Sequence, residues 1–258
     1  PEFTVVLDMP EGTALPDSAN VASMIAERLR GIEEVTAIQT YVGTARPFDF
    51  NRMVRHYDMR QYPWQAEIQI QLLDKAVRKD NGMRTSHQIA VDTREVITEL
   101  LADIPAKFAV VEMPPGPPVL QSVVAEVYGP DAGTRRKVAS DLTDIFREAE
   151  SLRDVDNYMM EDVTYWRYET DKDKAQLLGI TQEQINENLM MAFGSRPLGD
   201  VKSPAGKEPV NIMLQLPFAE RSQVARIGDL PITSGQNNTV PLRELGQFIE
   251  VEEDDIIY

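Results

Sequence analysis

The sequence predicts an α+β protein that contains a ferredoxin-like βαββαβ unit. Strand and helix patterns alternate in that order over the first part of the chain, and the same order begins again after a proline-rich stretch. That stretch is Val111-Glu112-Met113-Pro114-Pro115-Gly116-Pro117-Pro118-Val119. Its four prolines remove backbone donors and hold φ near −65°, so we expect a stiff connector between two similar α/β units.

The first unit opens with a strand, a helix and a second strand. Residues 4–7 are rich in β-branched residues and precede a Pro-Glu-Gly turn, which predicts a strand that ends there. Apolar residues recur at helical spacing over 16–31, with proline at the start and glycine at the end. The segment 35–42 then has the composition of a strand.

The same three-element pattern follows after a long loop. Apolar residues alternate with polar ones from Ile68 onward, which predicts a strand with one solvated face. Thr85 and Gln88 have the spacing of a capping box, so a helix is expected to begin there. A fourth strand is expected over 107–111, which completes the βαββαβ order.

After the connector, the pattern predicts only half of a second unit. Strands are expected over 123–128 and 155–160, with a helix between them that Asp131 caps. Because unpaired strand edges recruit partners, we expect the chain to associate with itself through one of these two edges. The sequence begins within a strand pattern and stops before this unit is completed, so we expect it to belong to a longer protein.

The last part of the chain predicts a β-rich insert. A strand is expected over 164–170, followed by a short helix over 171–178. Thr181 and Gln184 repeat the capping-box spacing and predict a second helix. A turn-rich stretch and short strand patterns follow, the last of them over 248–251.

Composition excludes several classes of function. The formal net charge of −16 argues against binding to nucleic acid or to an anionic membrane surface. The chain has no cysteine, so it forms no disulfide and no thiolate metal site. The lack of cysteine is compatible with both the periplasm and the cytosol. No apolar run approaches the ~18 residues of a membrane span. We therefore expect a globular domain with a sizeable core.

Two motifs resemble those of a known transporter family. Met9-Pro10-Glu11-Gly12-Thr13 is similar to an entry-strand turn, and Asp171-Lys172-Asp173-Lys174-Ala175-Gln176-Leu177-Leu178-Gly179-Ile180 is similar to a D-x-x-K-A-x-x-L-G-[VI] segment. With the order of elements, they resemble the second large periplasmic loop of resistance-nodulation-division (RND) efflux permeases of the acriflavin-resistance type. The resemblance covers essentially the whole chain.

The resemblance implies an organisation and a set of partners. It implies a porter subdomain over 1–117, the first half of a second porter subdomain over 118–163, and a docking subdomain over 164–258. It implies a periplasmic portion of a proton-driven pump of the inner membrane, which would be a homotrimer that exports small molecules such as drugs. Its partners would be a periplasmic adaptor and an outer-membrane channel. The carboxylates that carry protons in this family lie in membrane helices and not in this segment.

The resemblance also indicates a substrate pathway. Family pumps carry a flexible loop between substrate pockets at the position of residues 42–64, and this loop is rich here in aromatic, Met and Arg residues, which make adaptable contacts. The fourth strand contributes the pocket face in the family. The expected pathway residues are Phe48, Phe50, Met53, Tyr57, Trp64, Ile68, Ile70, Val111 and Met113. The alternative is that the loop aromatics pack on their own sheet and that Ile68 and Ile70 are core residues.

Metal export is a second hypothesis within the family. Copper or silver would be bound by soft thioethers, which Met53, Met59 and Met113 offer. The two histidines, His56 and His87, have no clustered partners in the sequence. No resident metal site and no cofactor is predicted.

Two classes of protein outside this family are relevant to the sequence, an enzyme and a solute-binding module. Enzyme activity is not expected, because the sequence shows neither a phosphate-cradling glycine loop nor a nucleophile with a paired base. A free-standing periplasmic solute-binding module remains an alternative. Membrane spans on both sides of this segment in the parent reading frame would favour the pump, whereas a signal peptide directly before it would favour the binding module.

Overall fold

The computed structural model describes residues 2–49, 53–55, 57–113, 123–157, 159, 163–202, 209–235 and 238–252. The chain divides between Val163 and Thr164 into two compact units. In the described ranges, no helix combines the length and the apolar character that crossing a membrane requires.

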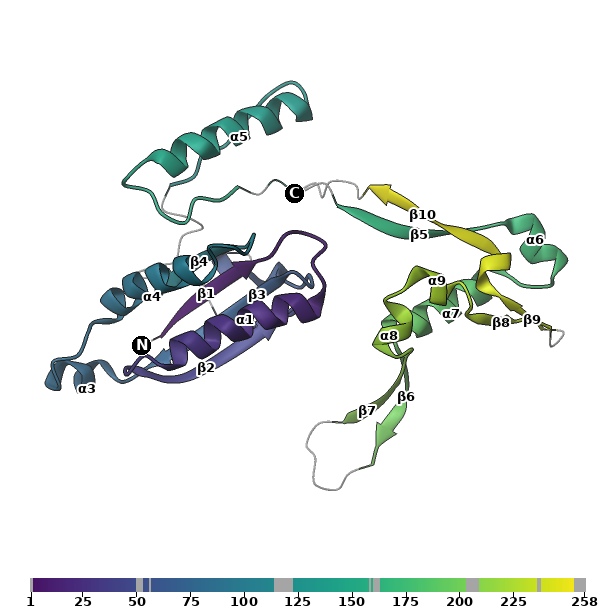
Figure 1. Cartoon of the computed structure of the whole chain (residues 1–258), viewed down its shortest axis with the longest axis horizontal. Helices are drawn as coiled ribbons and strands as arrows, with labels where there is room; N and C mark the ends of the chain where they lie inside the picture. The colour runs from purple at the N-terminus through teal and green to yellow at the C-terminus, as the bar shows by residue number, and fades with distance from the viewer. Residues whose placement is uncertain are drawn as a thin grey trace. The chain divides into compact units, whose positions relative to one another are not determined.

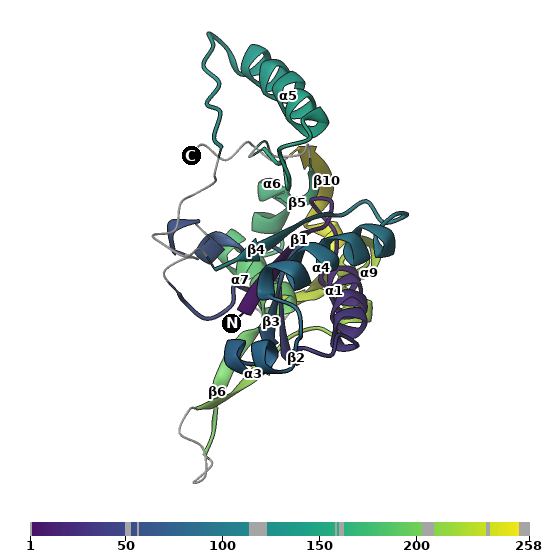
Figure 2. The ribbon, with the colours of Figure 1, turned by 90° about the vertical axis from the view of Figure 1, so that its left-hand side faces the viewer.

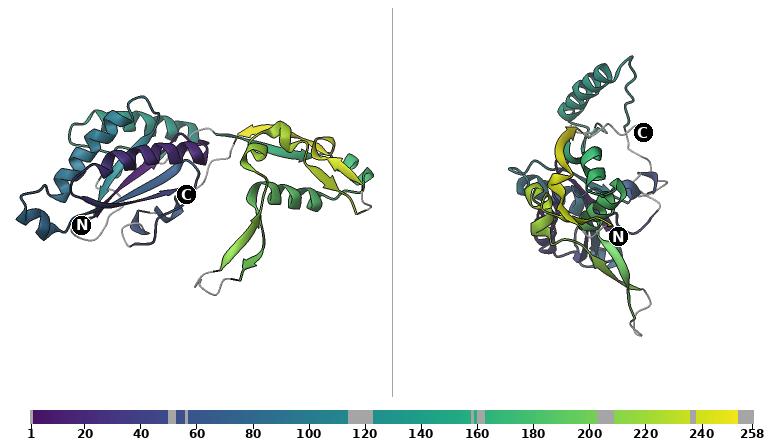
Figure 3. Two further views of the ribbon diagram at one scale, coloured as in Figure 1. Left: turned by 60° about the horizontal axis from the view of Figure 1, so that its bottom comes forward. Right: turned by 90° about the vertical axis from the view of Figure 1, so that its right-hand side faces the viewer.

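The first unit is built on a four-stranded antiparallel sheet. Its strands are β1 (Glu2–Asp8), β2 (Val35–Val42), β3 (Gln65–Leu72) and β4 (Lys107–Glu112), in the spatial order β2-β3-β1-β4. Helices α1 (Leu15–Arg30) and α4 (Ser86–Leu100) lie on the same side of this sheet (Figure 1, Figure 3). This is the expected ferredoxin-like βαββαβ arrangement.

The core of the first unit lies between the sheet and the two helices. Alternate residues of β1, namely Phe3, Val5 and Leu7, are buried there against Ile25 of α1 and Ile97 of α4. Residues that alternate along a strand point to opposite faces, so the helices cover one face of the sheet and leave the other free of them. The apolar stripe of each helix thus determines which sheet face becomes the core.

The predicted start of α4 is confirmed in detail. Thr85 Oγ1 accepts from the Gln88 backbone N at 3.2 Å, and the Gln88 side chain accepts from the Thr85 backbone N at 2.9 Å. A shorter helix, α3 (Lys75–Asp80), precedes it and is capped by Asp74. The loop between β2 and β3 contains the short 3-10 turn η1 (Tyr57–Met59).

The helix expected between residues 128 and 155 is confirmed, but the strands expected on either side of it are not. Helix α5 (Ala132–Glu148) is capped by Asp131, whose Oδ1 accepts from the Thr134 N at 2.8 Å. Residues 123–128 form no strand, and neither do 155–157 and 159; residues 158 and 160 lie outside the described residues.

These two segments form no strand because no neighbouring strand among the described residues pairs with them. A strand is stabilised by backbone hydrogen bonds to a neighbouring strand, and the described residues supply none for these segments. In addition, Asp154 has a positive φ of 54°, which interrupts an extended conformation just before 155. The predicted self-association through strand edges at 123–128 or 155–160 therefore has no strand to act through in this structure.

The second unit is organised around the antiparallel pair of β5 (Thr164–Thr170) and β10 (Gly246–Glu252). Helices α6 (Lys172–Leu177) and α7 (Gln182–Gly194) follow β5. The remaining elements are listed in chain order: β6 (Arg196–Val201), β7 (Val210–Leu214), α8 (Phe218–Arg221), α9 (Val224–Ile227), β8 (Pro231–Thr233), β9 (Thr239–Pro241) and the 3-10 turn η2 (Leu242–Glu244).

This unit has a small core of its own. Ile185 of α7, Ile232 of β8, and Leu242 and Leu245 around η2 are fully buried together. The predicted capping box of α7 is present, with Thr181 and Gln184 bonded reciprocally. The hairpin of β6 and β7 extends away from the β5–β10 pair (Figure 1), and the apolar side chains of its two strands are exposed.

Candidate functional site

The candidate site is the face of the first sheet that the helices leave uncovered. Strand register places Gln39, Gln69, Thr4 and Val111 side by side in one row across this face. The next row contains Tyr41, Glu67, Val6 and Ala109. This face, called the open face below because no helix of the βαββαβ unit covers it, is mostly polar, although Thr4, Val6, Glu67 and Val111 on it are buried.

The loop of residues 43–63 is anchored to this open face. Arg46 is only 5% exposed and forms an ion pair with Glu67, which is 1% exposed, with Nε and Oε2 3.0 Å apart. Arg46 also pairs with Asp49. Figure 2 shows the described parts of the loop on the side of the sheet away from α1 and α4. A buried arginine thus attaches the start of the loop to the middle of β3.

A second arginine attaches the end of the loop. Arg60 binds Asp8 through two hydrogen bonds, 2.8 Å from Nη2 to Oδ1 and 3.1 Å from Nη1 to Oδ2. Its Nη2 also donates to the Leu7 carbonyl oxygen at 2.9 Å. The guanidinium carbon lies 5.8 Å from the centroid of the Tyr57 ring. Bidentate arginine–carboxylate pairs are geometrically specific, so this contact fixes the loop near the end of β1.

The two anchors show what these loop arginines contact. Arg46 and Arg60 both pair with carboxylates of the chain itself, and Arg60 also stacks on Tyr57. Strand alternation places Asp8 and Glu67 on the face away from the core, but it does not show which arginine each one contacts.

The expected pathway residues fall into four groups, the last of which is made of strand residues. Phe48, Met53 and Met113 are exposed by 70%, 44% and 49%. Tyr57 and Trp64 are half-buried, and Trp64 stacks on Tyr62 with ring centroids 4.7 Å apart. Phe50 lies outside the described residues.

The strand residues of the predicted pathway are buried. Ile68 and Ile70 have no exposed surface and belong to the core under the helices, so they line no surface in this structure. Alternation along β3 places their neighbours Glu67 and Gln69 on the open face instead. Val111 is on the open face but is only 8% exposed.

The described residues hold no preformed metal centre. They contain no group of three or more His, Asp or Glu side chains arranged to hold an ion. His87 lies 2.9 Å from Glu112, through Nδ1 and Oε2, without a third ligand. His56 lies outside the described residues. The expected soft ligands Met53, Met59 and Met113 expose their thioethers, and so do Met24, Met190 and Met213.

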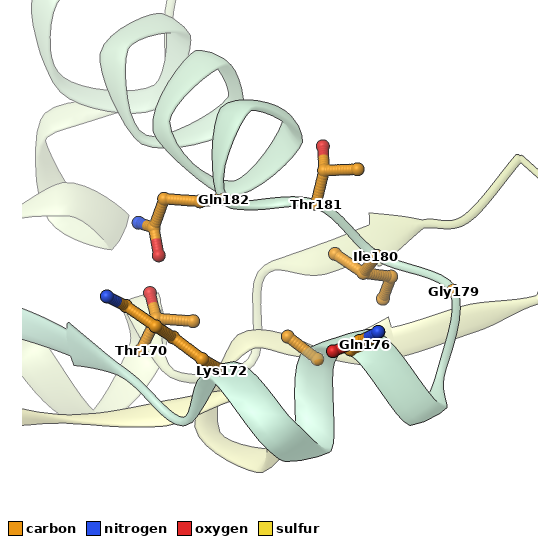
Figure 4. Close-up of a pocket in the computed structure, with 8 residues that line it drawn as sticks. Thr170, Lys172, Gln176, Gly179, Ile180, Thr181 and Gln182 are labelled. Atoms are coloured by element: carbon orange, nitrogen blue, oxygen red, sulfur yellow. The ribbon is translucent and has the colours of Figure 1, made fainter.

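The second unit has a hollow at its family-like motif. A cavity of about 380 Å³ lies between the start of α6 and the start of α7. Figure 4 shows the polar ends of Lys172 and Gln182 facing each other across the opening, with the Thr170 hydroxyl group close to them. The floor contains Ala175 and Ile180, which are almost fully buried. The motif therefore serves the packing of the α6–α7 turn.

Comparison with known proteins agrees with this fold. No curated protein matches the sequence. A crystal structure of a heavy metal efflux pump superposes with a TM-score of 0.69 at 17% identity over 98% of this chain. A second crystal form of a heavy metal efflux pump gives 0.67 at 18% identity, also over 98% of this chain. The chain spans about a quarter of the length of these two proteins, 25% and 26%.

The family model of the AcrB/AcrD/AcrF family matches residues 2–255. This match covers both units, the turn at Pro10 and the segment from Asp171 to Ile180. The chain therefore belongs to the AcrB/AcrD/AcrF family of RND efflux permeases, as its two motifs indicated.

Proposed function

We propose that the chain is part of the periplasmic portion of a proton-driven RND export pump, and that its open sheet face lines part of the export route. The observation that carries this proposal is the anchored loop. Arg46 and Arg60 hold the loop on the open face, while Phe48 and Met53 are exposed to solvent. An anchored loop with exposed aromatic and thioether groups offers adaptable apolar contacts on an otherwise polar face.

The proposal includes the organisation and partners that the family implies. Residues 1–117 would be a porter subdomain, 118–163 the first half of a second one, and 164–258 the docking subdomain. The division between compact units at Val163 supports the last of these boundaries. The exposed apolar hairpin of β6 and β7 supports contacts with other protomers of a homotrimer, with an adaptor or with an outer-membrane channel. The chain would act by binding and not by catalysis.

Metal export is the second candidate, and two observations favour it. Two of the solved structures that resemble this chain are of heavy metal efflux pumps. The exposed thioethers of Met53, Met59 and Met113 are ligands that suit copper(I) and silver(I).

The test is a transport assay on the intact parent gene in a strain that lacks its own pumps. Wild type is compared with a triple variant, Phe48→Ala, Phe50→Ala and Met113→Ala, for resistance to a panel of dyes and drugs and to copper and silver salts. A second variant combines Met53→Ala and Met113→Ala. The matched control is Met24→Ala, which removes an exposed thioether from α1 on the helix-covered side of the sheet.

Each outcome of this assay supports one of the candidate functions or contradicts the proposed role of the open face. Organic resistance that the triple variant narrows, with Met24→Ala unchanged, supports a drug route over the open face. Metal resistance that the Met53 and Met113 changes abolish supports a metal exporter. If neither variant alters resistance that the wild type confers, the open face does not line the route. A parent gene without membrane spans on both sides of this segment would instead support the solute-binding module.

A further inference from the structure

Among the residues that the structure describes, a single charged side chain lines an aromatic groove on the second unit. The groove has a volume of about 470 Å³, which is in the range of small-molecule sites. Its apolar walls come from the β5–β10 pair and from α7. They are formed chiefly by Trp166, Tyr168, Met190, Phe193 and Phe248.

These walls are preformed and partly open to solvent. Tyr168 and Phe248 face each other across the strand pair and make an edge-to-face contact, with centroids 5.1 Å apart. The Tyr168 hydroxyl group donates to the Leu242 carbonyl oxygen at 2.7 Å, which fixes the ring. Trp166 and Met190 are exposed by 54% and 71%. Exposed aromatic and Met side chains around a concave surface are typical of ligand contacts.

Arg221, at the end of α8, is the only charged residue among those that line the groove. Its Nη1 donates to the Phe193 carbonyl oxygen at 3.0 Å and to Gln215 Oε1 at 3.2 Å. Its Nε is buried and has no acceptor among the described residues. No carboxylate in the described part of the chain pairs with it, although the chain has 42 acidic residues.

The acidic side chains near Arg221 in sequence or on the same strand face are engaged elsewhere. Glu220 pairs with Arg226 at 2.5 Å. Glu250, which lies opposite Trp166 on the strand pair, accepts from Thr164 Oγ1 at 3.1 Å. Neither residue lines the groove. A guanidinium group without a counter-ion at an aromatic wall is suited to a carboxylate, to which its Nη2 can donate charge-assisted hydrogen bonds.

We infer that this groove binds an amphipathic carboxylate, with its apolar body between Trp166, Phe193 and Phe248 and its carboxylate on Arg221. The hydroxyl group of Ser222, the next residue and also in the lining, supplies a further donor. This site lies within the second unit and does not depend on whether the open face of the first unit lines an export route.

The test measures binding of two isosteric probes to the whole chain by isothermal titration calorimetry. Naphthalene-2-carboxylate and naphthalene-2-carboxamide have nearly the same shape and differ in charge. The carboxylate is expected to bind at least about tenfold more tightly than the amide, because only it forms charge-assisted hydrogen bonds. Acetate, which has no apolar body, is expected to give no measurable binding.

Substitutions in and beside the groove test whether Arg221 is the residue that binds the carboxylate. Arg221→Gln is expected to remove the preference for the carboxylate, whereas Arg226→Gln, which alters a neighbouring arginine outside the groove lining, retains it. Met190 offers a second test that spares the contacts of Arg221, because its side chain is 71% exposed. Met190→Glu is expected to lower the preference for the carboxylate over the amide, and Met190→Lys is expected to raise it, because the two changes place opposite charges beside the groove.

Three results would overturn the inference. The first is equal affinity for carboxylate and amide, the second is an unchanged preference in both Arg221→Gln and Met190→Glu, and the third is no binding of the carboxylate at millimolar concentration. Circular dichroism of each variant shows whether the fold is retained. If Arg221→Gln does not fold, the Met190 pair alone decides.

Discussion

At the scale of single residues, the most consequential contact is the buried ion pair of Arg46 and Glu67. Both side chains are almost fully buried, at 5% and 1% exposed, and they connect a loop to the open face of a strand. Removing one partner of such a pair leaves a charge in a poorly solvated place, which costs more than the pair contributed. Asp49 also contacts Arg46 and offsets part of that cost.

We therefore predict that Glu67→Gln lowers the free energy of unfolding by about 3 kcal/mol, at the lower end of the range for broken buried pairs. Urea unfolding of the chain, followed by Trp64 fluorescence in a Trp166→Phe background, measures the loss. Glu33→Gln is the matched control, because Glu33 is exposed. A loss no larger than that of the control would show that Glu67 does not hold the loop.

A second residue-scale prediction concerns pH. Arg84 donates to both carboxylate oxygens of Glu34, Nε to Oε1 at 2.9 Å and Nη2 to Oε2 at 2.7 Å. These hydrogen bonds lower the pKa of Glu34 from 4.5 to about 2. Because the folded pKa is lowered, this stabilisation is complete above pH 4.5 and is lost as the pH falls toward 2.

The expected contribution is about 1–2 kcal/mol, because the Arg84 side chain is 40% exposed and solvent screens the pair. Wild type should therefore lose more stability between pH 5 and pH ~2.5 than Glu34→Gln does. Urea midpoints at several pH values measure the difference. Parallel curves for the two proteins would mean that Glu34 makes no such contribution, and Glu33→Gln again serves as the exposed control.

At the scale of elements, the segment after α5 is attached to the edge of β4. Asp154 accepts from Arg94 Nη2 at 2.7 Å and from Arg94 Nε at 3.0 Å, and from the Val110 backbone N at 3.4 Å. Arg94 also donates to the Val110 carbonyl oxygen at 3.2 Å. Asn157 donates to Thr143 of α5 at 3.0 Å. Side chains thus satisfy backbone groups at a strand edge that a neighbouring strand would otherwise satisfy.

We predict that Asp154→Ala increases the exchange rate of the Val110 amide hydrogen, because this amide loses its acceptor. Asp154→Gly should have the same effect although glycine tolerates the φ of 54° better, since neither residue carries the carboxylate. Asp154→Asn keeps one acceptor oxygen and should retain part of the protection. Site-resolved hydrogen exchange makes this measurement. Full protection of Val110 in the alanine variant would contradict the assigned role.

At the scale of the whole molecule, the chain has two separate cores, one in each compact unit. Both units contain a helix that begins with a capping box, at Thr85 in the first and at Thr181 in the second. Each unit also contains one of the two tryptophans, Trp64 and Trp166. Each unit therefore has one capping box that can be removed by substitution and one tryptophan whose fluorescence can report its unfolding.

We predict that Thr85→Ala and Thr181→Ala each destabilise their own unit by about 1 kcal/mol, the usual cost of losing such a cap. Fluorescence of Trp64, with Trp166 replaced by Phe, should follow the first effect, and fluorescence of Trp166, with Trp64 replaced by Phe, the second. If either substitution shifts both transitions equally, the two units unfold together and the cores are not independent.

The sequence by itself determined the order of elements in the first unit, both capping boxes and the family. These features depend on contacts between residues close in the chain, or on short motifs such as the segment from Asp171 to Ile180. It also indicated strands at 123–128 and 155–160, which the structure does not form. A strand depends on a partner strand, often one distant in sequence, so composition alone cannot establish it.

Only the tertiary structure decided where the charged residues of the candidate sites meet. Arg46 and Glu67 are 21 positions apart, and Arg60 and Asp8 are 52 apart, so no local pattern reveals either pair. The sequence also does not reveal that Arg221 lacks a carboxylate partner among the described residues, because this depends on how the chain folds. Pairing between distant side chains follows from strand register and helix packing, and these are set only when the whole unit folds.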